Sequence, residues 1–322
     1  GTAGADTMLL PNTGGDLAMF ALAGDDVLGA QTTNDLIDGG NGNDTYYVDN
    51  LADTVIEHAG EGTADLVYST ISYRLTDHVE RLSLTGTQAT TGTGNALDNI
   101  LYGYSNTAAN VLIGGLGNDL FEVGAGDTVI ELAGEGIDRV STRVDFTLGS
   151  HVENLSAYTN TGLRLTGNEL NNSIAGRQGN DTLDGGAGKD SLNGAQGDDT
   201  YLFGRGDGAD WIFDADTTAG NQDTLRFQGD IEADQLWFRQ VSSHLEISVI
   251  GTGDKITIAN WYSGDQHKIE HIQISDQQAL AWKEVDLLVQ AMAAFAPPPM
   301  GQTTLTADRQ TALMPVIAGG WV

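Results

Sequence analysis

Residues 176–202 read GRQGNDTLDGGAGKDSLNGAQGDDTYL, and every ninth residue in this stretch is an aspartate: Asp181, Asp190 and Asp199. An apolar residue follows two positions after each aspartate, and glycines occupy many of the positions between. Glycine accepts backbone angles that other residues avoid, so it suits tight turns between short strands. The stretch therefore predicts a repeated unit of one turn and one short extended segment, with the apolar side chain pointing inward.

Two such units form one full coil, and the next coil stacks above it at the strand spacing of ~4.8 Å. Residues 18 positions apart then lie one above the other, which places Asp181 below Asp199 on one edge and Asn172 below Asp190 on the other. Stacked carboxylates repel each other unless a cation lies between them. The turn also aims peptide carbonyls at the same place, and a flexible set of oxygen ligands favours Ca²⁺ over Zn²⁺ or Mg²⁺. We therefore expect calcium sites between adjacent coils.

The nine-residue unit occurs in three runs, which we place at residues 1–48, 94–123 and 167–213. The aspartates at the repeat position in the first two runs are Asp26, Asp35, Asp44 and Asp119. Asparagine stands at this position at Asn99, Asn110 and Asn172. Because asparagine lacks the charge, we expect sites at these three positions to be weak or empty.

A longer repeat joins the runs, because DTVIEHAGEG at residues 53–62 recurs as DTVIELAGEG at 127–136. The intervening segments, residues 49–93 and 124–166, are rich in β-branched and aromatic residues, as strands are. Residues 214–296 alternate apolar with polar residues and end in a helical pattern that places Leu288, Ala291, Met292 and Phe295 on one face. The sequence therefore predicts an all-β fold: a parallel β-roll or β-solenoid with a C-terminal β cap and a short helix. Residues 297–322 begin with three prolines and are expected to form a flexible tail.

The composition favours cations as partners. The chain has 45 acidic and 14 basic residues and a net charge of −31, which argues against binding nucleic acid or an anionic membrane surface. No apolar run approaches the ~18 residues of a membrane span. Cysteine is absent, so disulfides are excluded. The start, GTAGADTML, contains no signal-peptide pattern, and we expect the chain to be the C-terminal piece of a longer protein.

The units GGNGNDTYY (39–47), GGLGNDLFE (114–122) and GGAGKDSLN (185–193) resemble the GGxGxDxUx nonapeptide of the RTX (repeats-in-toxin, haemolysin-type calcium-binding) family. The resemblance covers roughly residues 1–285, and the tail resembles the uncleaved secretion signal of that family. It implies a parallel β-roll that binds several Ca²⁺ ions between adjacent turns. It also implies secretion, by type I secretion machinery, to the outside or the surface of a Gram-negative bacterium.

The resemblance also implies a ligand set. In the family the first glycines and the third residue of the repeat offer backbone oxygens, and the aspartate offers its side chain. Besides Asp26 and Asp35, this assigns Gly39, Asn41 and Asp44; Gly114, Leu116 and Asp119; Gly176, Gln178 and Asp181; Gly185, Ala187 and Asp190; and Gly194, Gln196 and Asp199.

Three functions are compatible with these repeats. The main prediction is a calcium-binding module that folds on Ca²⁺ binding outside the cell and supports secretion and stability of a larger exported protein. The alternatives are the RTX half of a secreted enzyme (protease, lipase or epimerase) with its catalytic domain upstream, and part of an adhesin or surface-layer protein. The sequence does not identify a surface or host ligand. A β-solenoid whose aspartates only cap turns would bind no metal.

Other motifs carry less weight. HKIEH at 267–271 fits a zinc-protease pattern, but that chemistry needs a helix and the flanking residues alternate like a strand. Asp214, Asp216 and Asp223 lie in an acidic loop that could hold an extra cation, although their spacing does not fit an EF-hand. The Arg205-Gly206-Asp207 tripeptide is explained by the end of the repeat run. The sequence has no G-x-S-x-G and no cysteine nucleophile, so we expect no catalysis within these residues.

Overall fold

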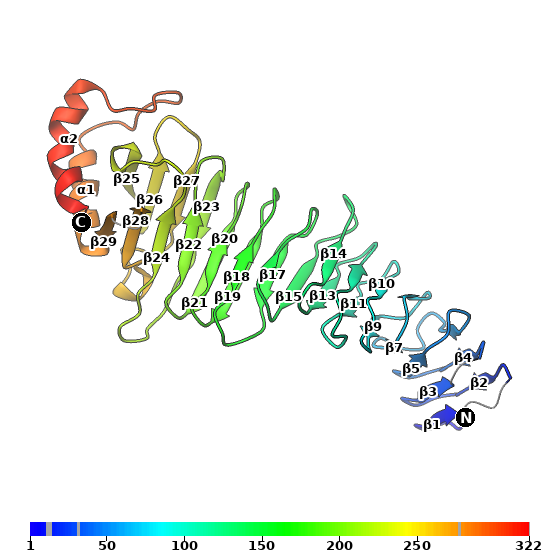
Figure 1. Ribbon diagram of the computed structural model, residues 1–322. Helices are drawn as coiled ribbons and strands as arrows, with labels where there is room; N and C mark the ends of the chain where they lie inside the picture. The colour runs from blue at the N-terminus through cyan, green and yellow to red at the C-terminus, as the bar shows by residue number, and fades with distance from the viewer. Residues whose placement is uncertain (11–14, 31–32, 276–277, 322) are drawn as a thin grey trace. The chain divides into compact units, whose positions relative to one another are not determined.

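The computed structural model describes residues 1–10, 15–30, 33–275 and 278–321. These residues form two compact units: residues 1–144 with 149–154, called unit 1, and residues 145–148 with 155–322, called unit 2. Figure 1 shows that short strands, stacked as successive coils, build most of each unit.

Unit 1 consists of parallel strands that stack on two sides of the coils. The first side has the order β1 (Thr7–Leu10), β3 (Val27–Ala30), β5 (Thr45–Val48), β7 (Leu66–Ser69), β9 (Arg81–Leu84), β11 (Ile100–Tyr102), β13 (Leu120–Val123) and β15 (Arg139–Thr142). The second side has β2 (Ala18–Phe20), β4 (Leu36–Asp38) and β6 (Thr54–Ile56), and then β8 (Tyr73–Arg74), β10 (Thr91–Thr93), β12 (Val111–Ile113) and β14 (Thr128–Ile130). Val27 pairs with Thr45, 18 residues later, as two repeats per coil require. The predicted parallel β-solenoid is confirmed.

The core of unit 1 is a column of inward-pointing side chains, one from each strand of the first side. Its fully buried members are Leu28, Tyr46, Val67, Leu82, Leu101, Phe121 and Val140, and consecutive members are register partners. Leu28, Tyr46 and Phe121 stand two residues after a repeat aspartate, so the apolar phase of the nonapeptide does point inward. Burying one such side chain stabilises the fold by ~1.5–3 kcal/mol.

Unit 2 begins with the same arrangement. One side has β17 (Asn154–Ala157), β19 (Ser173–Gln178), β21 (Ser191–Gln196), β23 (Ala209–Ile212), β27 (Lys255–Ile258), β26 (His244–Val249) and β25 (Leu236–Val241) in this order. The other has β16 (Phe146–Thr147), β18 (Arg164–Thr166), β20 (Thr182–Asp184), β22 (Thr200–Phe203), β24 (Thr224–Phe227), β28 (His271–Ser275) and β29 (Gln278–Ala281). The pairs β25–β26, β26–β27 and β28–β29 are antiparallel, and Trp237 and Trp261 are buried here. This antiparallel part is the predicted β cap.

In the described part of the chain, two α-helices follow the antiparallel strands, where the sequence predicts only one. Helix α1 (Trp282–Met292) buries Leu288 and Met292, as expected, together with Val285. Of the other two residues on the predicted face, Ala291 and Phe295, each is only half-buried. Among the described residues, no helix is both long and apolar enough to cross a lipid bilayer.

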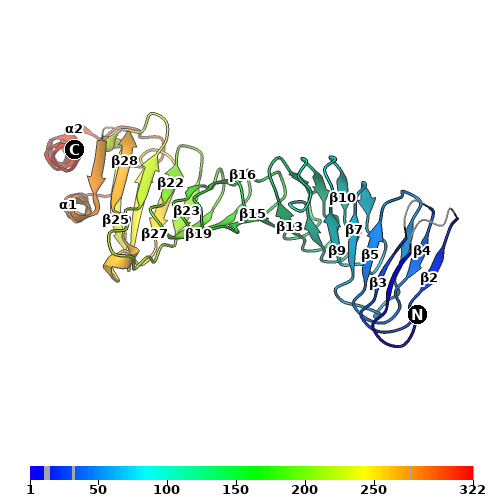
Figure 2. The same cartoon turned by 60° about the horizontal axis from the view of Figure 1, so that its bottom comes forward.

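The prediction that residues 297–322 form a flexible tail is wrong. This segment contains helix α2 (Ala307–Gly320), which packs against α1 (Figure 2). Leu313 and Ile317 lie one turn apart and are buried, as is Trp321, which bridges to Leu280. The segment contains Pro315 and ends in two glycines, which are poor helix formers, so docking of this apolar stripe outweighs local propensity.

The packing of α2 gives a stability prediction. Leu313 is 1% exposed, so Leu313→Ala is expected to lower the free energy of unfolding of unit 2 by about 2–5 kcal/mol, because it leaves a cavity. Met314 on the same helix is 37% exposed, and Met314→Ala serves as the control. Denaturant unfolding at saturating Ca²⁺ measures both variants. Equal stability of the two variants would mean that the tail is not docked in solution.

Candidate metal centre

The repeat aspartates stack along the edge of the coils and are linked by hydrogen bonds. The backbone N–H of Asp181 donates to Oδ1 of Asp199, at 2.7 Å. The N–H of Asp26 donates in the same way to Oδ1 of Asp44, also at 2.7 Å. On the other edge of the third run, the N–H of Asn172 donates to Oδ1 of Asp190. The structure thus shows the alignment of residues 18 apart, and one oxygen of each upper carboxylate is fixed by the coil below.

The second carboxylate oxygen is different. All seven repeat aspartates are only 1–2% exposed, and their Oδ2 atoms are buried without a hydrogen-bond partner among the described residues: Asp26, Asp35, Asp44, Asp119, Asp181, Asp190 and Asp199. Burying an ionised oxygen without compensation is expensive, and a bound cation supplies the missing interaction. The arrangement therefore fits Ca²⁺, which prefers carboxylate and carbonyl oxygens.

The first glycine of each repeat makes room for this oxygen. A Cβ atom built on the glycine would overlap Oδ2 of the aspartate five residues later, and this holds for Gly39, Gly114, Gly176, Gly185 and Gly194. None of these glycines has a positive φ, so the requirement is for space rather than for an unusual backbone angle. The structure therefore brings each predicted glycine to the aspartate of its own repeat.

The close approach of Gly194 to the Asp199 carboxylate gives a second prediction. Gly194→Ala is expected to displace the Asp199 carboxylate, weaken Ca²⁺ binding and lower the free energy of unfolding by about 1–3 kcal/mol, because the added methyl group overpacks the site. Gly253→Ala is the matched control, since its Cβ would meet open space. Calorimetric Ca²⁺ titration and denaturant unfolding measure both. Unchanged Ca²⁺ binding by the Gly194 variant would show that no ion binds at the Asp199 carboxylate beside this glycine.

The third residue of the repeat lies in the turn or at its edge: Asn41, Leu116 and Ala187 lie outside the named strands, whereas Gln178 and Gln196 are the last residues of β19 and β21. The carbonyls of Asn41 and Gln196 accept backbone N–H groups of Gly24 and Gly179 from the coil below, at 2.7 and 2.9 Å. A carbonyl oxygen has a second lone pair, so it can still contact an ion. Leu116, Gln178 and Ala187 occupy the same position in their repeats. The role of these five carbonyls as ligands stays a prediction.

The asparagines at the aspartate position make bonds that a carboxylate could not make. Nδ2 of Asn99 donates to the carbonyls of Val79 and Glu80, at 3.2 Å. Nδ2 of Asn110 donates to Oδ1 of Asp127, at 3.0 Å. An amide that satisfies neighbouring oxygens in this way does not need a cation, which supports the expectation of weak or empty sites there.

The structure also gathers acids that the nonapeptide pattern does not contain. Among the residues that the structure describes, carboxylate oxygens come within 4.8 Å of one another in three groups: Asp44, Glu57 and Asp65; Asp119, Glu131 and Asp138; and Asp199, Asp214 and Asp223. From the sequence, Asp214 and Asp223 are predicted only as part of an acidic loop, and the nonapeptide pattern does not predict the other four non-repeat acids. A signal was present, because Glu57 and Glu131 occupy the same position of the recurring DTVIExAGEG phrase. Asp216 lies outside these groups and bonds to Thr218.

Burial dominates the electrostatics of these acids. It raises the pKa of Asp44 and Asp181 to about 6, of Asp119 and Asp190 to about 7, and of Asp199 to about 8. Burial likewise raises the pKa of Glu57 and Glu131 to about 8. Part of this set is therefore protonated near neutral pH without metal, and Ca²⁺ binding must displace protons.

The HKIEH segment, residues 267–271, does not form the helical zinc site that its pattern suggests. No helix spans HKIEH, because a 3₁₀ turn (Asp265–His267) is followed by β28. His267 contacts the carbonyl of Asp214, whereas His271 contacts the side chain of Gln222.

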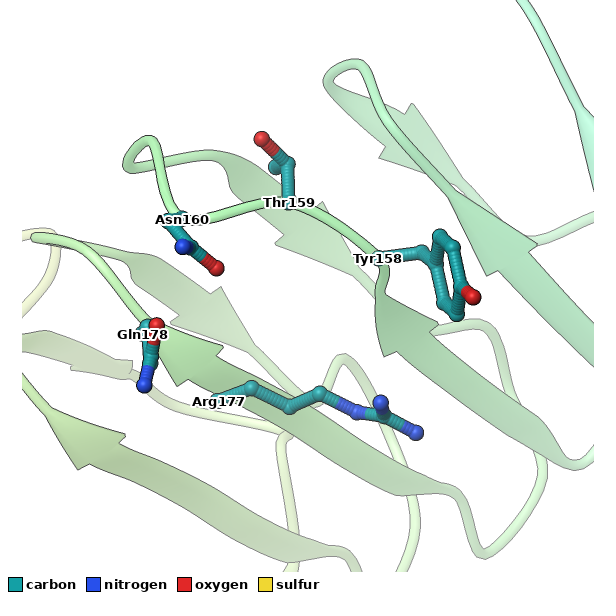
Figure 3. A pocket seen from close by; sticks show the side chains of 5 residues that line it. All are labelled: Tyr158, Thr159, Asn160, Arg177 and Gln178. Carbon is teal, nitrogen blue, oxygen red and sulfur yellow. The ribbon is translucent and has the colours of Figure 1, made fainter.

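An open pocket in unit 2 is lined by Tyr158, Thr159, Asn160, Arg177 and Gln178 (Figure 3). This lining contains no carboxylate or imidazole, the usual pair of groups for proton transfer.

The comparisons with known proteins agree with this geometry. The family model described as RTX calcium-binding nonapeptide repeat matches residues 20–55, 93–130 and 166–201. The model described as haemolysin-type calcium binding protein related domain matches residues 244–276, within the β cap. The first model describes a calcium-binding repeat, and the second describes a domain related to calcium-binding proteins of the haemolysin type.

Two curated proteins are similar over part of the chain. The iron-regulated protein FrpA of Neisseria meningitidis serogroup C is 37% identical over 93 residues, which are 28% of this chain and 8% of FrpA. The endo-1,3-1,4-beta-glycanase ExsH of Rhizobium meliloti (strain 1021) is 40% identical over 105 residues, 32% of this chain and 22% of ExsH. The chain thus spans less than a quarter of either relative. It carries three runs of the RTX calcium-binding nonapeptide repeat, and these runs bind Ca²⁺ ions.

Proposed function

We propose that this chain is a calcium-responsive folding module of a larger exported protein. The observation that carries the proposal is the set of seven buried repeat aspartates whose Oδ2 atoms have no hydrogen-bond partner in the described part of the chain. Where free Ca²⁺ is low, these carboxylates and a net charge of −31 oppose the compact state. Where Ca²⁺ is plentiful, binding to the folded form alone stabilises it.

The size of this effect is sufficient. An ion at ~100 times its dissociation constant contributes about 2.7 kcal/mol to folding. A few such ions match the ~5–15 kcal/mol stability of a whole domain. Calcium binding can therefore decide whether the chain is folded.

The second part of the proposal is export through type I secretion machinery. Proteins with RTX repeats are generally secreted by Gram-negative bacteria. Residues 297–322 are the proposed address, and in the folded chain helix α2 of this segment packs against α1. The address is then fully accessible only before the cap folds. A chain that stays unfolded at low Ca²⁺ meets this condition.

Export is tested in a strain that expresses a type I exporter. Deletion of residues 297–322 is expected to leave the chain in the cells, because the address is lost. The matched variant Leu313→Asp keeps the tail but disturbs its docking, and it is expected to reach the medium. Secretion of the truncated chain at the normal level would refute the address. Retention of both variants in the cells would indicate that export depends on docking of helix α2 rather than on the tail as an address.

A second candidate is that the module belongs to a secreted enzyme with a catalytic domain upstream. The observation in its favour is the 40% identity to ExsH, whose name describes a glycanase. A glycan-hydrolysis assay of the full-length gene product tests this alternative. Activity that persists when residues 1–322 are deleted would place catalysis upstream of the module, and absence of activity in the full-length product would count against the candidate.

A further inference from the structure

An acid replaces glycine in the coil that follows each run. In the first run Asp38 of β4 pairs with Ile56 of β6, so the next residues, Gly39 and Glu57, lie one above the other. The same register holds in the other runs. The glycine and acid that share a position are Gly39 and Glu57, Gly114 and Glu131, and Gly194 and Asp214. Where another nonapeptide would present its first glycine, the chain thus presents a carboxylate.

One oxygen of each replacing acid is fixed by a hydrogen bond. The Tyr46 hydroxyl donates to Oε1 of Glu57. The Tyr201 hydroxyl donates to Oδ2 of Asp214, at 2.7 Å. Phe121 occupies the tyrosine position in the second run, and there the backbone N–H of Gly114 donates to Oε1 of Glu131, at 2.8 Å. A tyrosine hydroxyl in the first and third runs, and a backbone N–H group in the second, thus fix one oxygen of the acid.

The other oxygen of each acid is buried and has no partner among the described residues: Oε2 of Glu57, Oε2 of Glu131 and Oδ1 of Asp214. The three side chains are only 6%, 4% and 3% exposed. Each acid lies with the aspartate of the last repeat and with an aspartate of the next coil, and the ligand oxygens of each trio fall within 4.8 Å of one another. All nine side chains are more than nine-tenths buried. Three buried carboxylates this close repel one another strongly when ionised, and a bound cation offsets this repulsion and supplies the missing partner of each free oxygen.

We infer that each run of nonapeptides ends in a closing site, a three-carboxylate cation site in which the last repeat aspartate is joined by two acids from the non-repeat segment that follows. The closing sites are Asp44–Glu57–Asp65, Asp119–Glu131–Asp138 and Asp199–Asp214–Asp223. The inference rests on the proposed calcium-dependent function and refines it. A closing site carries one more charge than a pair of stacked repeat aspartates, and affinity for Ca²⁺ rises with the ligand charge. It also ties the first residues after each run to the ion, so binding docks that segment onto the roll.

The first experiment is calorimetric Ca²⁺ titration of the whole chain and of Glu131→Gln. The amide keeps the acceptor for the Gly114 N–H but removes the charge. We expect one ion to bind roughly tenfold more weakly or to be lost. Glu135→Gln is the matched control, because Glu135 lies in the same phrase and outside the trio, where it caps the Leu132 N–H. Identical titrations of the two variants would overturn the closing site. If the unaltered chain itself bound no Ca²⁺, the proposed function would fail instead.

The second experiment keeps every carboxylate. Tb³⁺ replaces Ca²⁺ at oxygen sites, and its emission can be excited through a phenol that is close to the ion. Tyr46→Phe and Tyr201→Phe are each expected to lose a distinct part of the tyrosine-excited emission, because these hydroxyls bond directly to closing-site acids. Phe121 shows that phenylalanine fits this position. Tyr158→Phe, at an exposed position, is the control. Unchanged emission in both test variants would refute the inference, even if Glu131→Gln failed to fold.

Discussion

Removal of Ca²⁺ is expected to unfold most of the chain. The repeat aspartates and the closing-site acids are buried side by side, and without a cation their mutual repulsion and lost hydration oppose the coils. In circular dichroism the β spectrum should be lost in excess chelator and return with millimolar Ca²⁺. Mg²⁺ should restore less, because it demands shorter and more regular coordination.

The alternative expectation is that the buried apolar side chains alone keep the chain folded without Ca²⁺. If the column that contains Leu28, Leu101 and Phe121 were sufficient, the spectrum and the melting temperature would not change in chelator. That result would show that the carboxylates are tolerated without an ion. A control titration with Na⁺ at the same ionic strength separates specific binding from screening of the net charge.

Acidification is expected to have opposite effects on the ion-free and the calcium-loaded chain. Burial raises the pKa of Asp181, Asp190 and Asp199 to about 6, 7 and 8. An unfolded aspartate titrates near ~3.9, so each group favours the ion-free fold at low pH and disfavours it as pH rises through the folded pKa. The cost is ~1.4 kcal/mol per unit of raised pKa and per group.

The ion-free chain should therefore gain β structure when the pH is lowered from about 8 to about 5, since protons neutralise these acids. The Ca²⁺ concentration that half-saturates the folded chain should rise over the same range, because protons compete with the ion for these buried carboxylates. Circular dichroism across pH measures the first trend, and calorimetric Ca²⁺ titration at about pH 5 and about pH 8 measures the second. A Ca²⁺ affinity of the folded chain that does not depend on pH would contradict the buried carboxylates as ligands.

The repeat part of the fold could be predicted from sequence because its information is local. The nine-residue spacing of Asp181, Asp190 and Asp199 sets both the coil length and the phase of the inward residues, and each coil contacts only its neighbours. Helix α2 could not be predicted in this way. Leu313 and Ile317 become an apolar stripe only when α1 and the cap present a surface for them, and Pro315 argues locally against a helix.

The candidate site, like the fold, could be predicted from the sequence only in part. The repeat aspartates and their glycines follow from the nonapeptide, since both partners lie within one unit. Glu57, Glu131 and Asp214 join the site only because the register of the next coil places them over Gly39, Gly114 and Gly194. They lie outside the nonapeptide, so their contact with the repeat aspartates depends on strand pairing rather than on a motif.

A crystallographic anomalous difference map of the chain grown with Ca²⁺ would locate the bound ions. We expect peaks within ~2.3–2.6 Å of the buried Oδ2 atoms that lack a partner in the described part of the chain, those of Asp44, Asp119, Asp181, Asp190 and Asp199. Peaks confined to exposed carboxylates, with these aspartates protonated and without metal, would contradict this expectation.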